Sequence, residues 1–445
     1  MLRSLTLAHR LSQHRGRNML KYYFKLSLYN LKRAPVLYTL VIITLAIGVG
    51  AFVANLAMIK TMASDPIPSK SGQLFHVSMN TYPANQNQQP LDVTRYTDAK
   101  AIMDSGIPTK TAITYRTSAY TRVADSPSLT RYASEIRATT KDFFLMMNAP
   151  FLFGQGFSDD RAQEVVLSFK LNNTLFNGQN SVGKTIEVGG GLYKVAGVLE
   201  KWDLRPMFYH VANGLEFQGT ESIFAPLETA LDANWFAEVR STSTDNWDSM
   251  GETRTANTYY LQTWVQLDTV DQAQKMQDFL DNFSQKLKDQ GQHPNPIINH
   301  LDDVNQWLTT NQVVDKRVLA FAIATGLFLA VCIFNASSLL LARYSSANFE
   351  TGLKRALGAS KKQIMHQGLV EGLVAGALAG LLSLALSWLF LRISTQLLPD
   401  LATIAVLDGK ILLCGFAIAL FTTLLSALYP LFRAGQTSIS AELKG

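Results

Sequence analysis

Apolar residues are gathered in four long runs that are spaced unevenly along the chain. One run, Val36–Ile59, is followed by 258 residues of mixed polar and apolar sequence. Three more runs then follow, at Val318–Leu341, Leu369–Leu391 and Ile411–Leu431. Each run is 21 to 24 residues long, enough for an α-helix to cross about 30 Å of hydrocarbon. The pattern predicts an α-helical membrane protein with four transmembrane helices in a 1+3 layout, which excludes a soluble enzyme.

Between the first two runs the sequence changes to that of a folded extramembrane domain. The pattern predicts two sets of elements, each in the order strand, helix, strand. The first set is at Gln73–Asn80, Asp98–Asp104 and Thr111–Thr121, and the second is at Thr258–Leu267, Asp271–Lys288 and Asn295–His300. The long helix of the second set carries a core-facing apolar stripe that includes Met276 and Leu280. Helices near 50–64 and 302–317 are expected to extend the first two membrane helices outward as a stalk. The domain is therefore α+β, with two βαβ units around an insertion.

Charge predicts the orientation of the helices. Residues 1–35 carry eight basic side chains, and the first acid is Asp65. Residues 60–317 carry 23 basic and 29 acidic side chains, a net charge of −6, so with +6 for the whole chain the other residues carry +12. Because short positive loops stay in the cytoplasm, both termini and the loop 342–368 are expected inside and the large domain outside. The positive net charge is then a sign of topology, and no nucleic-acid partner is expected.

The N-terminal segment is predicted to be a basic helix at the membrane surface. From Leu20 onward apolar residues such as Phe24 and Leu28 recur at helical spacing, with lysines on the other faces, until Pro35. The first apolar run, which follows this segment, is too long for a cleaved signal peptide, so the first membrane helix is expected to be retained. Met19 is a plausible start of the protein.

One motif suggests nucleotide binding, but its context contradicts that interpretation. Gly178–Thr185 fits the phosphate-loop pattern GxxxxGK[ST]. Such a loop needs a buried strand before it and a helix after it. Here the preceding segment 171–176 is polar, and Ile186–Leu199 alternates and contains glycines, as in a β-hairpin. No ATP hydrolysis is expected on this chain.

Catalytic and metal sites are also not expected. The seven histidines are scattered and form no HExxH pattern, and no nucleophile elbow is present. Cys332 and Cys414 both lie in predicted membrane helices, where they serve as small apolar residues. The chain is therefore expected to have no catalytic residue, no cofactor and no metal of its own.

Three segments carry a family resemblance. The loop sequence from Glu350 to Ala359 resembles the E-x-G-x-x-(K/R)-A-x-G-A segment of the MacB/FtsX/LolC-type (type VII) ABC transporter permeases. Tyr429-Pro430, followed by Arg433-Ala434, is similar to the end of that family's last helix. The segments at 142–144, 154–157, 183–186 and 195–198 resemble the MacB-type periplasmic core. MacB carries a fused ATPase domain, and only about 34 residues precede the first helix here, so a separate ATPase chain is implied.

This resemblance assigns a role to the loop 342–368. In the family, a short cytoplasmic coupling helix docks in a groove of the ATPase subunit. The matching residues are Glu350, Gly352, Leu353, Lys354, Arg355, Ala356, Leu357 and Gly358. Leu353, Ala356 and Leu357 would form one apolar edge, and Gly358 would end the helix. A solvated, positively charged loop is the alternative interpretation.

The third membrane helix has a glycine every four residues. These glycines are Gly368, Gly372, Gly376 and Gly380. Without side chains they let another helix approach closely, so we expect a packing face, either within the bundle or in a dimer. Glu371 lies beside this stripe, and a structural role is expected for it.

The resemblance also implies a division of the chain. The expected parts are a basic helix at 1–34, the first membrane helix and stalk at 35–64, a periplasmic domain at 65–301, a stalk and second helix at 302–341, the coupling loop at 342–368, helices at 369–391 and 411–431 around a periplasmic loop at 392–410, and a tail at 432–445. The periplasmic domain would contain a porter-like subdomain (65–122 and 255–301) and a sabre-like insert (123–254).

A function follows as an expectation. The chain would be the inner-membrane permease subunit of a MacB-like efflux system in bacteria, with ATP and Mg on a partner ATPase. A second permease copy or a sister permease, a periplasmic adaptor, a TolC-like outer-membrane channel and membrane lipid are the expected partners. Two alternatives stay open: a lipoprotein-releasing permease of the LolC/E kind, and an FtsX-like signalling protein that controls a cell-wall hydrolase.

Overall fold

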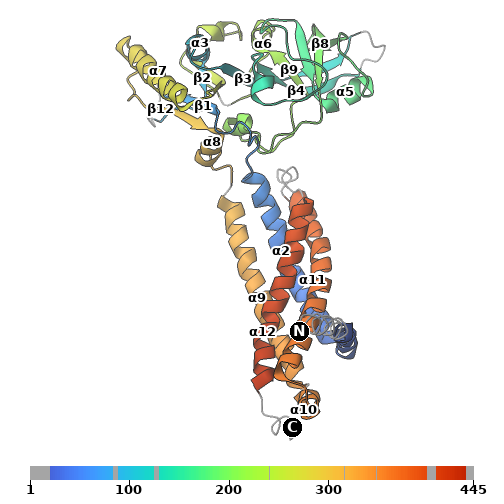
Figure 1. Cartoon of the computed structure of the whole chain (residues 1–445). Helices are drawn as coiled ribbons and strands as arrows, with labels where there is room; N and C mark the ends of the chain where they lie inside the picture. The colour runs from blue at the N-terminus through green and yellow to red at the C-terminus, as the bar shows by residue number, and fades with distance from the viewer. Residues whose placement is uncertain are drawn as a thin grey trace, which may run out of the picture. The chain divides into compact units, whose positions relative to one another are not determined.

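The chain divides into two compact units, which we call the helical unit and the extramembrane domain (Figure 1). The helical unit is Met1–Thr61 with Asp315–Gly445, and the extramembrane domain is Met62–Val314. The computed structural model describes residues 21–83, 89–124, 130–239, 241–314, 316–346, 348–397 and 407–436. Met19, the plausible start, lies outside the described residues.

Within the described residues, four helices of the helical unit are long and apolar enough to cross a membrane. They are α2 (Pro35–Met62), α9 (Lys316–Ser346), α11 (Lys361–Leu397) and α12 (Gly409–Gln436). Even the 28 residues of α2 or α12 span about 42 Å, more than the hydrocarbon layer. The four helices run side by side in Figure 1. The predicted 1+3 layout is confirmed.

The described residues of this unit also form two short helices. Residues 21–33 form what we call the N-terminal helix, and α10 (Asn348–Ala356) lies between α9 and α11 in the chain. On the N-terminal helix the buried residues are Tyr23, Ser27 and Asn30, whereas Phe24 is 51% exposed. Proline is well placed at the start of α2, because the first amides of a helix have no partner within it.

In the extramembrane domain the described residues form one 12-stranded sheet. The strands are β1 (Leu74–Met79), β2 (Thr94–Arg95), β3 (Lys110–Val123), β4 (Tyr132–Thr139), β5 (Phe151–Gly154), β6 (Glu164–Leu167), β7 (Thr185–Val188), β8 (Gly191–Leu199), β9 (Ile223–Pro226), β10 (Thr242–Ser243), β11 (Thr258–Gln266) and β12 (Asn299–Asp303). The helices are α3 (Tyr96–Asp104), α4 (Phe143–Met146), α5 (Phe169–Phe176), η1 (Phe208–Asn213), α6 (Leu227–Asp232), η2 (Glu252–Arg254), α7 (Val270–Asp289) and α8 (Val304–Thr310).

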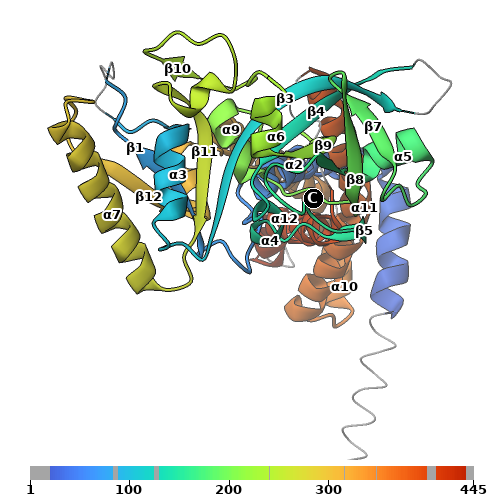
Figure 2. The same cartoon turned by 90° about the horizontal axis from the view of Figure 1, so that it is seen from above.

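Two interlocked βαβ units form one part of this domain. The strand order β12-β1-β11-β3 consists of antiparallel pairs, so β1 is parallel to β3 and β11 is parallel to β12. The crossover helices α3 and α7 lie next to these strands in Figures 1 and 2. Ile102 of α3 packs with Met276 and Leu280 of α7 in one buried cluster. The predicted βαβ pair and the core face of the long helix are confirmed.

The rest of the sheet continues from the long strand β3. Its order is β3-β4-β9-β6-β8-β5, with β7 pairing both β3 and β8. This part contains the segment expected as the insert. Its strand β4 pairs with Thr114–Thr121 of β3, so the sheet is continuous across both parts. Gly189 and Gly190 have φ values of +58° and +89° between β7 and β8, which is typical of a tight hairpin turn. The predicted hairpin is confirmed.

A buried ionic cluster lies inside this second part. Arg137 of β4 is 0% exposed and donates to Glu221, which also contacts His210 of η1. Burial alone would raise the pKa of Glu221, but the nearby Arg137 and His210 bring it below its usual range. Burial, assisted by Arg137, lowers the pKa of His210 to about 4.

Two boundaries predicted from the sequence are wrong. Residues 302–317 do not extend the second membrane helix as a stalk: α8 is a separate helix that ends at Thr310, and α9 begins at Lys316. The reason is hydrophobic, since Val304, Trp307 and Leu308 are buried in the core of the extramembrane domain. The last strand lies at Asn299–Asp303, four residues later than its predicted start, where it pairs with β1.

Candidate functional site

The short helix α10 is held firmly to the helix that follows it. At its end Gly358 has a φ of +99°. The Ala359 amide donates to the Lys354 carbonyl and the Gly358 amide to the Arg355 carbonyl, each at 3.0 Å, which is the Schellman pattern. The Ser360 side chain then accepts from the Gln363 amide, while Gln363 Oε1 accepts from the Ser360 amide. This capping box starts α11, so a short, fully hydrogen-bonded turn joins α10 to α11.

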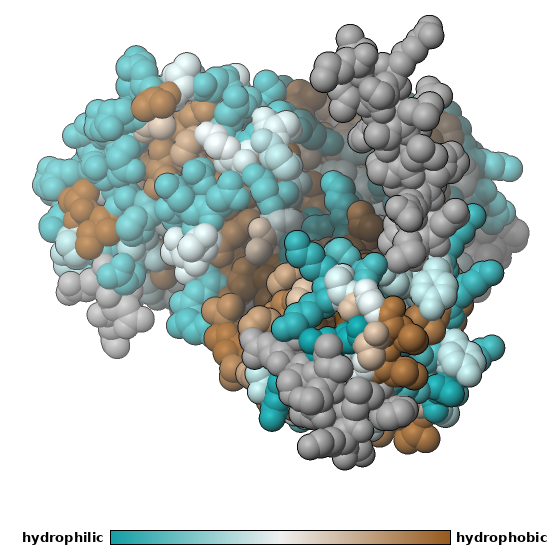
Figure 3. All heavy atoms as spheres, turned by 60° about the horizontal axis from the view of Figure 1, so that its bottom comes forward, coloured by the Kyte–Doolittle hydropathy of each residue, from teal (hydrophilic) through white to brown (hydrophobic). Residues whose placement is uncertain are grey.

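One edge of α10 is apolar and uncovered. Leu353 is 46% exposed, Leu357 is 81% exposed, and Ala356 beside them is also exposed. Figure 3 brings this end of the helical unit forward and shows hydrophobic and hydrophilic side chains exposed next to each other. An uncovered apolar edge on a charged helix indicates a docking surface.

The opposite side of α10 contacts the rest of the unit. Gly352 is buried. Arg33 of the N-terminal helix donates to Glu350 Oε1 at 2.7 Å, and Lys354 Nζ makes a long contact of 3.5 Å with Gln367 of α11. Partial burial lowers the pKa of Lys354, helped by Arg343 and opposed by Glu350. Arg355 is half-buried. The helix is thus joined to the N-terminal helix as well as to α11.

A second polar contact ties the N-terminal helix to α11. Asn30 Nδ2 donates to Glu371 Oε2 at 2.9 Å, and Glu371 is only 3% exposed. Next to it is a small space of about 40 Å³, bordered also by Glu350 and Lys354, with room for one or two water molecules. Glu371 therefore lies where it holds the N-terminal helix in place, as its expected structural role requires.

The glycine stripe of α11 faces α12. A Cβ on Gly368 would lie 2.1 Å from Leu431, on Gly376 3.1 Å from Thr423, and on Gly380 2.7 Å from Phe416. At Gly372 the nearest atom would be 3.6 Å away, on Ala427. The stripe therefore packs against α12 of the same chain.

The phosphate-loop match has the wrong surroundings for a nucleotide. Helix α5 precedes Gly178, and the β7–β8 hairpin follows Lys184, the reverse of the strand–loop–helix order that such a loop needs. The Gly183 amide donates to the Val195 carbonyl at 2.8 Å and is already occupied. The motif is part of a hairpin.

Sequence reasoning missed the partners of the site. Glu350 is contacted by Arg33, Glu371 by Asn30, and Lys354 by Gln367. These three partners lie in segments that the loop motif does not include. One signal was available for Asn30: with Tyr23 and Ser27 it forms an i, i+4, i+7 series of residues able to hydrogen-bond on a helix beside the membrane. A polar stripe of this kind needs partners in protein.

Two family models match the chain. The MacB-like periplasmic core domain matches residues 38–282, more than half of the chain, and the FtsX-like permease C-terminal domain matches residues 322–439. The second match includes α10 and the glycine stripe. No match was found among the curated proteins.

Solved structures are similar to about half of the chain, at low identity. The extracellular domain of the ABC-type transporter YknZ from Gram-positive bacteria has 13% identity and a TM-score of 0.34, covering 52% of this chain and 100% of that one. The periplasmic region of MacB from Actinobacillus actinomycetemcomitans has 12% identity and a TM-score of 0.35, covering 56% and 95%. A domain of a permease protein from Porphyromonas gingivalis has 13% identity and a TM-score of 0.35, covering 53% and 92%.

Proposed function

The chain belongs to the MacB/FtsX type of ABC transporter permease, and from that premise we propose that it is the membrane subunit of a MacB-like efflux system in the inner membrane. In this proposal both termini and α10 lie in the cytoplasm, and the extramembrane domain lies in the periplasm. A partner ATPase is implied by the family. The chain itself would bind no nucleotide and would pass motion from that ATPase to the periplasm.

The observation that carries the proposal is the construction of α10. Its apolar edge, with Leu353 and Leu357, is open to a partner, and its other side is joined to two further helices. Only Leu357–Ser360, which form the Schellman turn and the start of the capping box, lie between α10 and α11. If an ATPase groove moved the edge of α10, the short connection would therefore move α11, a helix of 37 residues, with it.

The close packing of α11 on α12 supports motion of these two helices as one body. An added Cβ would clash with α12 at Gly368 and Gly380 and would be tight at Gly376, so the two helices pack with their backbones close together. Such packing favours transmission of motion over conduction of a substrate between these helices. Substrate would then be taken up in the periplasm, in the extramembrane domain, and passed to an adaptor and an outer-membrane channel.

A substitution on the apolar edge tests the coupling role. Leu353→Glu places a carboxylate where a leucine would be buried against the ATPase, and binding of the ATPase should weaken at least about tenfold. The measurement is co-purification of the tagged full chain with its ATPase, together with the ATP hydrolysis rate in proteoliposomes. Leu192→Glu, on a leucine of the extramembrane domain that is also exposed (61%, against 46% for Leu353), is the matched control. Wild-type assembly and export in Leu353→Glu would remove the coupling role from α10.

Mass spectrometry of the proteins that co-purify from native membranes tests the efflux role. An ATPase together with a periplasmic adaptor supports it. An ATPase with a lipoprotein chaperone would favour the LolC/E-like alternative, and one with a peptidoglycan hydrolase would favour the FtsX-like alternative. Recovery of the chain with no ATPase would contradict the transporter assignment.

A further inference from the structure

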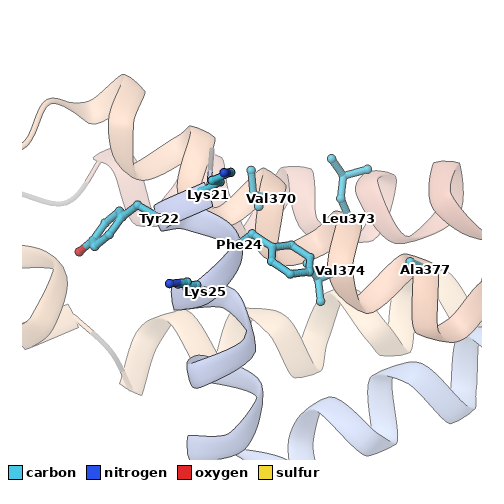
Figure 4. A pocket seen from close by; sticks show the side chains of 8 residues that line it. All are labelled: Lys21, Tyr22, Phe24, Lys25, Val370, Leu373, Val374 and Ala377. Atoms are coloured by element: carbon cyan, nitrogen blue, oxygen red, sulfur yellow. The ribbon is translucent and has the colours of Figure 1, made fainter. Parts of the chain in front are cut away.

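A wide groove lies between the N-terminal helix and α11 in the helical unit (Figure 4). Its volume is about 820 Å³, within the range of pockets that bind small molecules. One wall carries Lys21, Phe24 and Lys25, and the other carries Val370, Val374 and Ala377. In Figure 4 Phe24 lies against Val374, and Lys21 lies near Val370. The groove is therefore basic on one wall and apolar on the other.

Helix geometry places each set of residues on a single face. Lys21 and Lys25 are four residues apart, so their side chains project from the same side of the N-terminal helix. Val370, Val374 and Ala377 follow one another at spacings of four and three along α11. Their stripe continues toward the middle of a helix that is apolar enough to cross a membrane. A ligand with one charged end and one long apolar end would match this arrangement.

The positive charge of the groove is not neutralised by nearby acids. In the part of the chain that the structure describes, neither Lys21 nor Lys25 forms an ion pair. Glu371, the acid that α11 carries beside this stripe, is buried and accepts a hydrogen bond from Asn30. The groove therefore offers two cations to a ligand.

We propose that this groove binds one molecule of an anionic phospholipid. The phosphate would lie between Lys21 and Lys25, and one acyl chain would follow Val370, Val374 and Ala377 along α11. The apolar wall belongs to a membrane-spanning helix, so lipid is the medium that surrounds it. The two lysines favour an anionic headgroup over a zwitterionic one. The site is independent of the proposed export function, and it fastens the N-terminal helix, which also holds α10 through Arg33.

Native mass spectrometry of the full chain in detergent tests the proposal. The probes are phosphatidylglycerol and phosphatidylcholine with identical acyl chains. Wild type should prefer phosphatidylglycerol, and Lys21→Gln and Lys25→Gln should each weaken its binding about fivefold. Lys32→Gln removes the same charge from an exposed position of the same helix outside the groove, and it should leave the affinity unchanged.

Val374→Trp fills the apolar wall and should weaken binding of both lipids. Equal effects of the three lysine substitutions, or no preference between the lipids, would overturn the proposal in favour of diffuse surface charge. Unchanged phosphatidylglycerol binding by Val374→Trp would place the lipid elsewhere. A dimer that excludes lipid, and that dissociates in Val374→Trp, would overturn it in favour of a second copy in the groove.

Discussion

The extramembrane domain should lose stability in mild acid because of one buried histidine. His76 of β1 is 0% exposed. Its ring stacks on Trp307 of α8, with centroids 3.6 Å apart, and meets the edge of Trp264 at 5.2 Å. Nδ1 is 3.2 Å from Ser78 Oγ. Burial among these rings lowers the pKa of His76 to about 3, and a hydrogen bond to the Asp92 backbone only partly opposes this.

The sign of the effect follows from proton binding. Between pH 6.5 and about 3 the unfolded chain binds a proton at this position and the folded chain does not, so acid favours unfolding. The contribution of neutral, buried His76 to the stability of the domain is fully retained above pH 6.5 and is lost as the pH falls through this window. Between pH 7 and pH 5 the loss is about 2 kcal/mol.

The substitution that isolates this effect is His76→Phe, which keeps a ring between the tryptophans and removes the titrating group. At pH 7 it should cost about 1 kcal/mol for the lost hydrogen bond to Ser78. At pH 5 it should be more stable than wild type by about 1 kcal/mol, since the roughly 2 kcal/mol acid loss of wild type is absent.

Urea unfolding of the full chain in detergent, followed by tryptophan fluorescence at both pH values, gives the difference. His300→Phe, on an exposed histidine of β12, controls for the substitution itself. If His76→Phe loses as much stability between pH 7 and 5 as wild type does, the burial argument is wrong.

Three further predictions follow from the packing. Glu221→Gln leaves its buried arginine partner without a counter-charge and should destabilise the extramembrane domain by about 3–5 kcal/mol in the same urea titration; a loss below 1 kcal/mol would contradict this. Gly380→Leu should destabilise the helical unit by about 1–3 kcal/mol in thermal melts, whereas Gly372→Ala, which has room for its Cβ, should be close to neutral. Arg33→Glu should reduce ATP-driven transport with under about 1 kcal/mol change in stability, because the pair is half-exposed, and adding Glu350→Arg should restore it; no rescue would refute a role for the pair.

The membrane layout and one half of the extramembrane domain could be predicted because their signals are local. Runs of 21 to 24 apolar residues need a membrane, and the spacing of Met276 and Leu280 indicates a helix face. The end of α10 was predictable for the same reason, since Gly358 alone supplies the positive φ that the turn requires.

What the sequence did not reveal depends on contacts between distant segments. Residues 304–310 have a helical pattern that continues a membrane helix as well as it forms a separate one, and only the fit of Trp307 into the domain core decides between them. The partners Arg33 and Asn30 lie more than 300 positions from Glu350 and Glu371. The glycine spacing predicts close packing but does not name the helix that packs there.

The pairing of the first and last strands has a consequence for biosynthesis. β1 lies between β11 and β12 in the sheet, so the extramembrane domain cannot close until residue 303 has been made. The α2 helix ends at Met62, and the buried faces of Val41 and Leu45 meet Ala336, Leu340 and residues of α11 and α12. Translation proceeds at roughly 5–20 residues per second, so on the order of 13 to 50 s pass between synthesis of the end of α2 and synthesis of the start of α9. Throughout that interval it must persist in the lipid as a lone helix, and the ribosome delivers its first partner only after the domain's last strand is complete.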